Sequence, residues 1–147
     1  MPVLFHVTGI NGIEGAADAY RLIGETWSAA RRIFPHKHVF SKYEMTLVSN
    51  CIGIRLQGGF LRRSYDRLLD PFLLGTHKDK QLLETLTVFV LDAGMHTGKT
   101  AERMAVHTNT VQYRLKKIND LLGADTTGNR VIPGLTIALA LHRMEQE

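Results

Sequence analysis

The stretch TAERMAVHTNTVQYRLKKI, residues 100–118, decides how the C-terminal half of the chain folds. Two amphipathic segments meet at Val106 and His107 with almost nothing between them. The second segment runs from about Thr108 to Leu122, and Gly123 ends it. Its apolar residues recur at helical spacing on one face: Val111, Leu115, Ile118 and Leu122. The sequence therefore predicts a short helix, a tight turn and a longer helix.

The opposite face of the longer helix carries polar and basic side chains. At about 100° per residue this face presents Asn109, Gln112, Tyr113 and Lys116, with Lys117 beside them. Arg114 falls about 60° from the apolar stripe, so we expect it to flank the core. Asparagine and glutamine can read adenine with two hydrogen bonds, lysine reaches guanine or phosphate, and tyrosine reaches phosphate.

This arrangement is typical of the helix-turn-helix motif, whose second helix enters the major groove of DNA with its N-terminus first. We therefore predict a DNA-binding surface with these candidate contact residues: Lys99, His107, Thr108, Asn109, Thr110, Gln112, Tyr113, Lys116 and Lys117. His107 and Thr108 precede the helix, and the sequence leaves open whether they cap it or touch phosphate. Ala105 occupies a turn position where glycine is usual, so a positive φ there would cost about 1 kcal/mol.

The distribution of charge favours the same interpretation. The net charge is only +4 over 147 residues, and residues 81–147 hold seven Lys/Arg and seven Asp/Glu. Residues 99–118 nevertheless carry five basic side chains against Glu102, a local +4. A neutral region with one basic strip indicates a localised anionic partner. The alternative is a solvated helix face.

The composition, 44% hydrophobic and 22% charged, is that of a soluble globular protein. The longest nearly apolar run, residues 131–141, is broken by Pro133 and is too short to cross a bilayer. The N-terminal residues lack the basic region and cleavage site of a signal peptide. Cys51 is the single cysteine, so we expect a core residue, no intramolecular disulfide and a cytoplasmic protein.

The pattern of residues 1–44 indicates a small β-α-β unit. VLFHVTG has strand propensity, a glycine-rich loop follows it, and a helix then extends to about Ile33. HVFSKYE, residues 38–44, is interpreted as a second strand parallel to the first. We expect the helix to bury this face: Ala16, Tyr20, Ile23, Trp27, Ala30 and Phe34.

The glycine-rich loop, residues 9–15, stands between a strand and a helix, where phosphate can bind to backbone N–H groups. Its spacing matches neither the dinucleotide fingerprint nor the P-loop, and Glu14 and Asp18 would repel phosphate. We interpret the loop as a structural turn and keep a ligand-sensing role as a third hypothesis, which nucleotide-dependent thermal stabilisation would reveal.

Residues 45–80 predict a helical connector with interruptions at Gly58-Gly59 and Asp70-Pro71, followed by a polar linker at residues 75–80. The connector contains an apolar seam: Phe60, Leu61, Tyr65, Leu68, Leu69, Phe72 and Leu73. One helix-turn-helix makes too few contacts for useful specificity, so we expect a homodimer on half-sites about one helical turn apart. The seam and a final helix containing Leu135, Leu139 and Met144 are the candidate dimer surfaces.

Residues 81–144 include LLETLTVFVLDAG, TAERMAVHTNTVQYRLKKINDLLG and IALALHRM. They resemble the C-terminal helix-turn-helix of PucR/CdaR-type bacterial transcription regulators, and NTVQYRLKKI also resembles the Fis-like motif. GIEGAADAYRLIGETWSAARRIFPHKHVFSKYE is similar to the last part of the GGDEF-like middle domain of those regulators. In that family the domain is degenerate and is not regarded as a cyclase.

The resemblance implies an effector-responsive regulator, of which this chain is the C-terminal piece or a naturally short version. A small-molecule effector would then act through a sensory region that this chain lacks. Gly98 stands where the family more often has serine, which implies that Gly98 is a helix N-cap.

Enzymatic alternatives have little support, because the seven histidines lack zinc-site spacing and the motifs of serine hydrolases, zinc proteases and P-loop enzymes do not occur. We expect no catalytic site, cofactor or metal, and no membrane association.

The predicted fold is mainly α, with a helix-turn-helix domain at residues 81–147 preceded by the small α/β segment and the connector. The predicted function is sequence-specific binding of double-stranded DNA by a transcriptional regulator. The alternative is a protein–protein interaction or dimerisation module that does not bind DNA directly.

Overall fold

The computed structural model describes residues 2–146. In chain order its elements are β1 (Leu4–Phe5), α1 (Gly12–Ile33), β2 (Val39–Phe40), α2 (Lys42–Gln57), α3 (Gly59–Asp66), a 3-10 turn (Arg67–Leu69), α4 (Asp70–Leu73), α5 (His77–Thr87), a π-helical turn (Val88–Asp92), α6 (Thr97–Met104), α7 (Thr108–Leu122) and α8 (Ile132–Glu145). The expected fold class, mainly α with a small α/β segment near the N-terminus, is confirmed.

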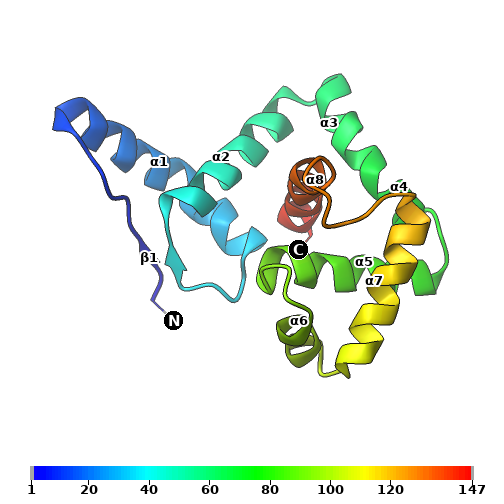
Figure 1. The fold of residues 1–147 in the computed structure, drawn as a ribbon. Coiled ribbons are helices and arrows are strands. Elements are labelled where there is room, and N and C mark those ends of the chain that lie inside the picture. The colour runs from blue at the N-terminus through cyan, green and yellow to red at the C-terminus, as the bar shows by residue number, and fades with distance from the viewer. Residues whose placement is uncertain (1, 147) are drawn as a thin grey trace.

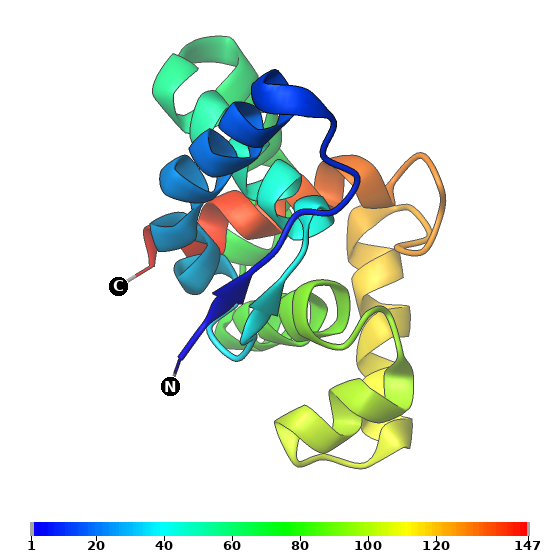
Figure 2. The ribbon, with the colours of Figure 1, turned by 90° about the vertical axis from the view of Figure 1, so that its left-hand side faces the viewer.

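The strands β1 and β2 lie side by side and parallel, with α1 as the crossover between them (Figure 2). Leu4 is opposite Val39 and Phe5 is opposite Phe40, and the two phenylalanine rings stack 4.8 Å apart. The predicted β-α-β unit is thus present. Its second strand is shorter than residues 38–44, because Ser41 caps α2 and the helix has begun by Lys42.

A capping box fixes the start of α2. The Ser41 backbone N–H donates to the Glu44 carboxylate at 2.9 Å, the Ser41 hydroxyl also bonds that carboxylate, and Lys37 forms an ion pair with it at 3.0 Å. Burial alone would raise the pKa of Glu44, but the bonds with Ser41 and Lys37 outweigh burial and lower this pKa to about 2. The carboxylate therefore stabilises the helix start in its charged form.

The face that α1 buries agrees only in part with the predicted one. The buried residues of α1 are Ala19, Thr26, Ala30 and Ile33, and Phe34 just after the helix is buried as well. Ala30 and Phe34 were expected, and Ile23 is half-buried against the same core. Tyr20 and Trp27 are instead 83% and 49% exposed, and Ala16 is exposed as well. The prediction gave weight to the aromatic side chains, whereas the core shared with α2 takes Ala30 and Ile33 of α1, with Leu22 and Ile23 packed against it. The hydroxyl of the buried Thr26 donates to the Leu22 backbone oxygen at 2.6 Å, so this polar group has a partner within its own helix.

Glycines separate α2 from α3 as predicted, since Gly58 and Gly59 have φ of 59° and 61°. The predicted polar linker at residues 75–80 is wrong. Residues 77–80 form the first turn of α5, where the Thr76 backbone N–H donates to the Asp79 carboxylate at 2.7 Å in a second capping box.

The apolar seam of the connector is divided between core and surface. Leu69 and Phe72 are buried, whereas Phe60 is 73% exposed and Leu68 is partly exposed. The seam therefore contributes its last turns to the core and leaves α3 largely open.

Helix α8 occupies the middle of the molecule (Figure 1). On one side Ala140, Leu141 and Met144 join a core formed by α1, β2 and α2. On another side α8 joins a second core, built with the 3-10 turn, α4, α5 and α7, through these residues: Leu135, Ala138 and Leu139. Because both sides are buried, α8 does not offer the free dimer surface expected from the sequence.

Arg143 of α8 links the end of α1 to the π-helical turn that precedes α6. It forms a two-pronged ion pair with Asp92, at 2.7 Å for each hydrogen bond, and donates to the Ile33 backbone oxygen at 3.0 Å. Among the described residues, none of the helices has the length and apolar character needed to cross a membrane.

Candidate nucleic-acid interface

A tight left-handed turn joins α6 to α7. Ala105 has φ 54° and ψ 44°, which is the positive φ considered for this position from the sequence. The Val106 backbone N–H donates to the Ala101 backbone oxygen at 3.0 Å, and Ala101 is buried. A small residue at position 101 therefore lets the two helices approach closely.

The inner face of α7 anchors it to the second core. Val111 and Ile118 are fully buried, and Leu115 and Leu122 pack against the core cluster that contains Leu83 and Leu86 of α5. These four residues of α7 are the stripe predicted from the sequence. Gly123, with φ 66°, ends the helix as expected.

Two histidines cap the helices of the motif. The Asn109 backbone N–H donates to His107 Nδ1 at 3.1 Å, so His107 is the N-cap of α7. The Lys99 backbone N–H donates to His96 Nδ1 at 3.2 Å, so His96 caps α6. The expectation that Gly98 is an N-cap is wrong, because Gly98 lies inside the helix. A Cβ at Gly98 would stand 3.2 Å from the His96 ring, so glycine leaves room for this cap.

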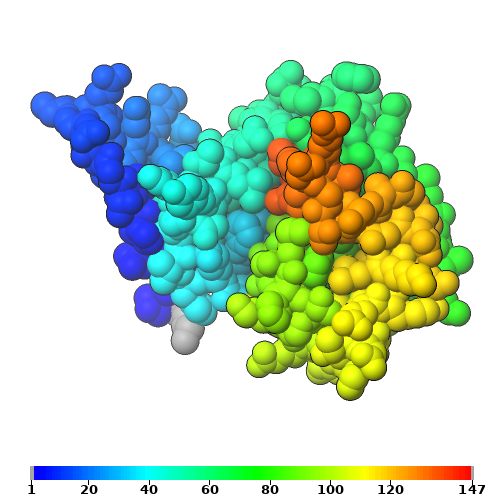
Figure 3. All heavy atoms as spheres, viewed as in Figure 1, coloured from blue at the N-terminus to red at the C-terminus, as the bar shows by residue number. Residues whose placement is uncertain are grey.

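The outer face of α7 is open to solvent, and its surface forms the lower right of the molecule in Figure 3. Asn109, Gln112, Tyr113, Lys116 and Lys117 are exposed. The Lys117 ammonium lies over the Tyr113 ring, 5.5 Å from its centroid. Thr108 and Thr110, also predicted contact residues, are half-buried in the first turn. The structure thus brings the predicted α7 residues together on one side of the helix.

Of the five basic residues in positions 99–118, only the three lysines present a free charge beside α7. Lys99, Lys116 and Lys117 are exposed and make no ion pair with the residues described. Arg114 instead donates to the Thr85 hydroxyl at 3.2 Å and flanks the core as predicted. Arg103 lines a cavity of about 710 Å³ between α5, α6 and α8. The exposed positive charge beside α7 therefore comes from lysines.

Other candidate sites have structural explanations. Gly9 and Gly12 have φ of 72° and 70°, so the N-terminal loop uses glycine for its backbone geometry. Cys51 is buried in the first core, and burial raises the pKa of its thiol to about 11. Within residues 2–146, His, Cys, Asp and Glu side chains form no group of three that could hold a metal ion.

Comparison with known proteins identifies the C-terminal half. The family described as the PucR C-terminal helix-turn-helix domain matches residues 82–141. The purine catabolism regulatory protein of Bacillus subtilis (strain 168) is 34% identical over 84 residues, which cover 57% of this chain and 16% of that protein. An uncharacterized protein of Mycobacterium tuberculosis (strain ATCC 25618 / H37Rv) is 40% identical over 63 residues, which cover 43% of this chain and 15% of that protein.

The matched part of the chain thus spans about one sixth of the length of these relatives. No solved structure matches the chain. The family match contains the turn at Ala105, the buried stripe of α7 and its exposed polar face. Residues 82–141 therefore match the family of the PucR C-terminal helix-turn-helix domain over the whole of the motif described above.

Proposed function

We propose that this chain is a sequence-specific, non-catalytic transcriptional regulator that inserts α7 into the major groove of double-stranded DNA. One observation carries the proposal: α7 has an inner face packed on the second core, with Val111 and Ile118 fully buried, and an exposed outer face bearing Asn109, Gln112 and Lys116. A reading helix needs this combination, because the buried face fixes the orientation in which the polar side chains meet the base edges.

The candidate residues divide into those that would contact bases and those that would contact phosphate. Asn109 and Gln112 lie in the first turns of α7, where an inserted helix meets bases, and each can bind adenine with two hydrogen bonds. Lys116, Lys117 and Lys99 are point charges suited to phosphate. Tyr113 and the hydroxyls of Thr108 and Thr110 would add polar contacts to the DNA backbone. His107 positions Asn109 through the cap, and its exposed ring stands beside the same surface.

We also propose that the chain acts as part of a longer, effector-responsive regulator in the cytoplasm. The matched relatives are several times longer than their aligned segments, which supports further regions in the complete protein. Residues 1–44 would be the end of a GGDEF-like domain, residues 45–80 a helical connector, and residues 81–147 the DNA-binding domain. A small-molecule effector would act through a region outside this chain.

A homodimer completes the proposal, since one reading helix contacts few base pairs. Its half-sites would lie one helical turn, or a whole number of turns, apart, because each copy must meet the same face of the duplex. The distance follows from the surface through which the copies pair.

The salt dependence of binding tests the proposal. Lys116→Ala and Lys117→Ala should weaken binding on every duplex, and the slope of log K against log salt should fall by about 0.9 for each phosphate that the variant no longer neutralises. Arg55→Ala removes an exposed charge from the far end of α2 and serves as the matched control. The proposal fails if both lysine variants keep the wild-type slope, and the alternative of a protein-interaction module would then be preferred.

A further inference from the structure

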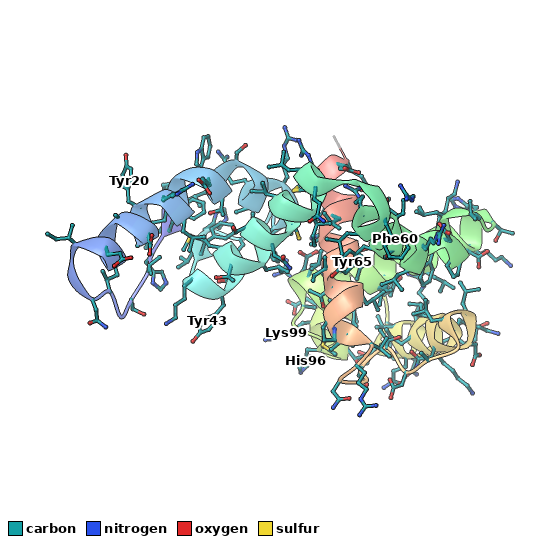
Figure 4. All side chains as sticks on the ribbon, turned by 90° about the horizontal axis from the view of Figure 1, so that it is seen from above. Tyr20, Tyr43, Phe60, Tyr65, His96 and Lys99 are labelled. Atoms are coloured by element: carbon teal, nitrogen blue, oxygen red, sulfur yellow. The ribbon has the colours of Figure 1, made fainter. Side chains whose placement is uncertain are left out.

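The outward face of α1 carries an apolar stripe that the described residues leave uncovered. Ile13, Tyr20 and Trp27 recur every seven residues and are 90%, 83% and 49% exposed. Figure 4 shows Tyr20 pointing from α1 away from α2. An exposed apolar patch on this scale is typical of an interaction surface.

Small residues alternate with the bulky ones on this face. Ala17 and Gly24 are both exposed, and a Cβ at Gly24 would meet nothing within 4 Å. Heptad spacing of large and small side chains is the pattern by which two helices pack knobs into holes. In an antiparallel pair of α1 helices, Trp27 lies over Ala17 of the second copy and Tyr20 lies over Gly24 of the second copy. Two-fold symmetry repeats both contacts, so the stripe is complementary to itself.

The charges of α1 fit the same pairing. Glu14 lies in the first turn and Arg32 in the last, and neither forms an ion pair with residues 2–146. The antiparallel alignment places Glu14 of one copy beside Arg32 of the second copy, on the same side of the helix pair, and symmetry repeats the contact. Opposite charges therefore meet at each end of the contact and favour this alignment.

The exposed surface of α3 and the following 3-10 turn is less suited to self-pairing. Phe60 of α3 and Leu68 of the turn are accompanied there by Arg63 and Arg67, which are also exposed. A two-fold contact through this face would bring arginines of both copies together, and like charges across an interface are unfavourable.

The area available on α1 suits a reversible dimer. The helix has 22 residues and is about 33 Å long. From the exposed fractions of Tyr20 and Trp27, the aromatic side chains of two copies can bury roughly 500 Å². Ile13 and the flanking side chains add to this area. The total approaches the lower limit of roughly 1,200 Å² for specific interfaces, a size typical of reversible rather than permanent complexes.

We propose that α1 is the two-fold contact of a homodimer, in which the α1 helices of two copies pack antiparallel. This inference deepens the proposed function by naming the contact between the DNA-binding copies. Because α1 and α7 lie at opposite ends of the molecule (Figure 1), such a dimer carries its two reading helices at its outer ends. The half-sites are then several helical turns apart rather than one.

Sedimentation velocity of the full chain, without DNA, tests the contact. The wild-type chain should sediment as a dimer at tens of micromolar, and Tyr20→Glu should raise the dimer dissociation constant at least about tenfold, since it buries an unpaired charge. Tyr43→Glu, which changes a similarly exposed tyrosine on α2, should leave the dimer intact. A wild-type monomer, or equal effects of the two variants, overturns the proposal.

A disulfide tests the alignment of the two helices. Ala17→Cys combined with Ser28→Cys should cross-link two copies under mild oxidation. Within one helix these positions are about 16 Å apart, beyond the reach of a disulfide. The native Cys51 is buried and does not compete. Either single-cysteine variant should stay uncross-linked, and efficient cross-linking of Ala17→Cys alone would overturn the antiparallel arrangement. Neither assay contains DNA, so a failure here is distinguishable from a failure of DNA binding by α7.

Discussion

Replacing Arg143 with methionine is predicted to destabilise the whole fold strongly. The Arg143 guanidinium donates two hydrogen bonds of 2.7 Å to Asp92 and one of 3.0 Å to the Ile33 backbone oxygen. The Asp92 side chain is only 7% exposed. Methionine fills much of the same space but donates nothing, so the Asp92 carboxylate would remain buried without its counter-charge. Removal of one partner from a buried pair costs about 3–5 kcal/mol, a large share of the roughly 5–15 kcal/mol that stabilises a domain.

Urea unfolding at pH 7, followed by far-UV circular dichroism, measures this cost. Arg62→Met is the matched control, because the partners of Arg62, Asp66 and Glu145, are about half exposed and water can replace the hydrogen bonds of the guanidinium. Its expected cost is about 1 kcal/mol. Adding Asp92→Asn to the Arg143 variant should restore part of the stability, since no charge is then left buried. Equal costs for the two arginine variants, or no recovery in the double variant, would refute the reasoning.

Three further variants test local features of the fold. Val111→Ala removes two methyl groups from a fully buried site and should lower the free energy of unfolding by about 2 kcal/mol in the same urea assay. Ala105→Gly should raise the melting temperature, because glycine adopts a φ of 54° without the cost, of the order of 1 kcal/mol, that alanine meets there. Glu44→Gln should cost about 1 kcal/mol at pH 7. The folded pKa of Glu44 is lowered to about 2, so its contribution is complete above the unfolded pKa of about 4.3. That contribution is lost as the pH falls toward 2, and stability curves of mutant and wild type should converge there; parallel curves would contradict it.

The sequence predicted best the features that depend on local periodicity. Val111, Leu115 and Ile118 repeat at helical spacing, and glycine at position 123 is a strong end signal, so α7 was predicted with its buried face. Arg114 could be placed at the edge of the core from its angle to the stripe. The same arithmetic gave the exposed face of α7, whose contact with DNA stays a prediction.

Tertiary packing explains what the sequence did not predict. Tyr20 and Trp27 form a stripe at helical spacing as convincing as the one that is buried, and only the position of α2 decides between the two faces of α1. Histidine is not among the usual N-cap residues, so the cap of α6 by His96 had little signal. Arg103 counted toward a basic strip in the sequence but lines a cavity on another side of α6. The sequence shows which residues share a face of a helix, whereas the neighbouring elements decide which of these faces is exposed.

The most direct test of the central claim compares specific with random DNA for variants of the reading face. A preferred duplex is first selected from a random pool, and competition binding then gives the ratio of specific to random affinity. Asn109→Ala and Gln112→Ala should each lose about 1–3 kcal/mol on the preferred site and little on random duplexes, so the ratio falls roughly 5- to 150-fold. Lys116→Ala should instead weaken both by a similar factor. If Asn109→Ala and Gln112→Ala both keep the wild-type ratio, α7 does not read the sequence and the account is contradicted.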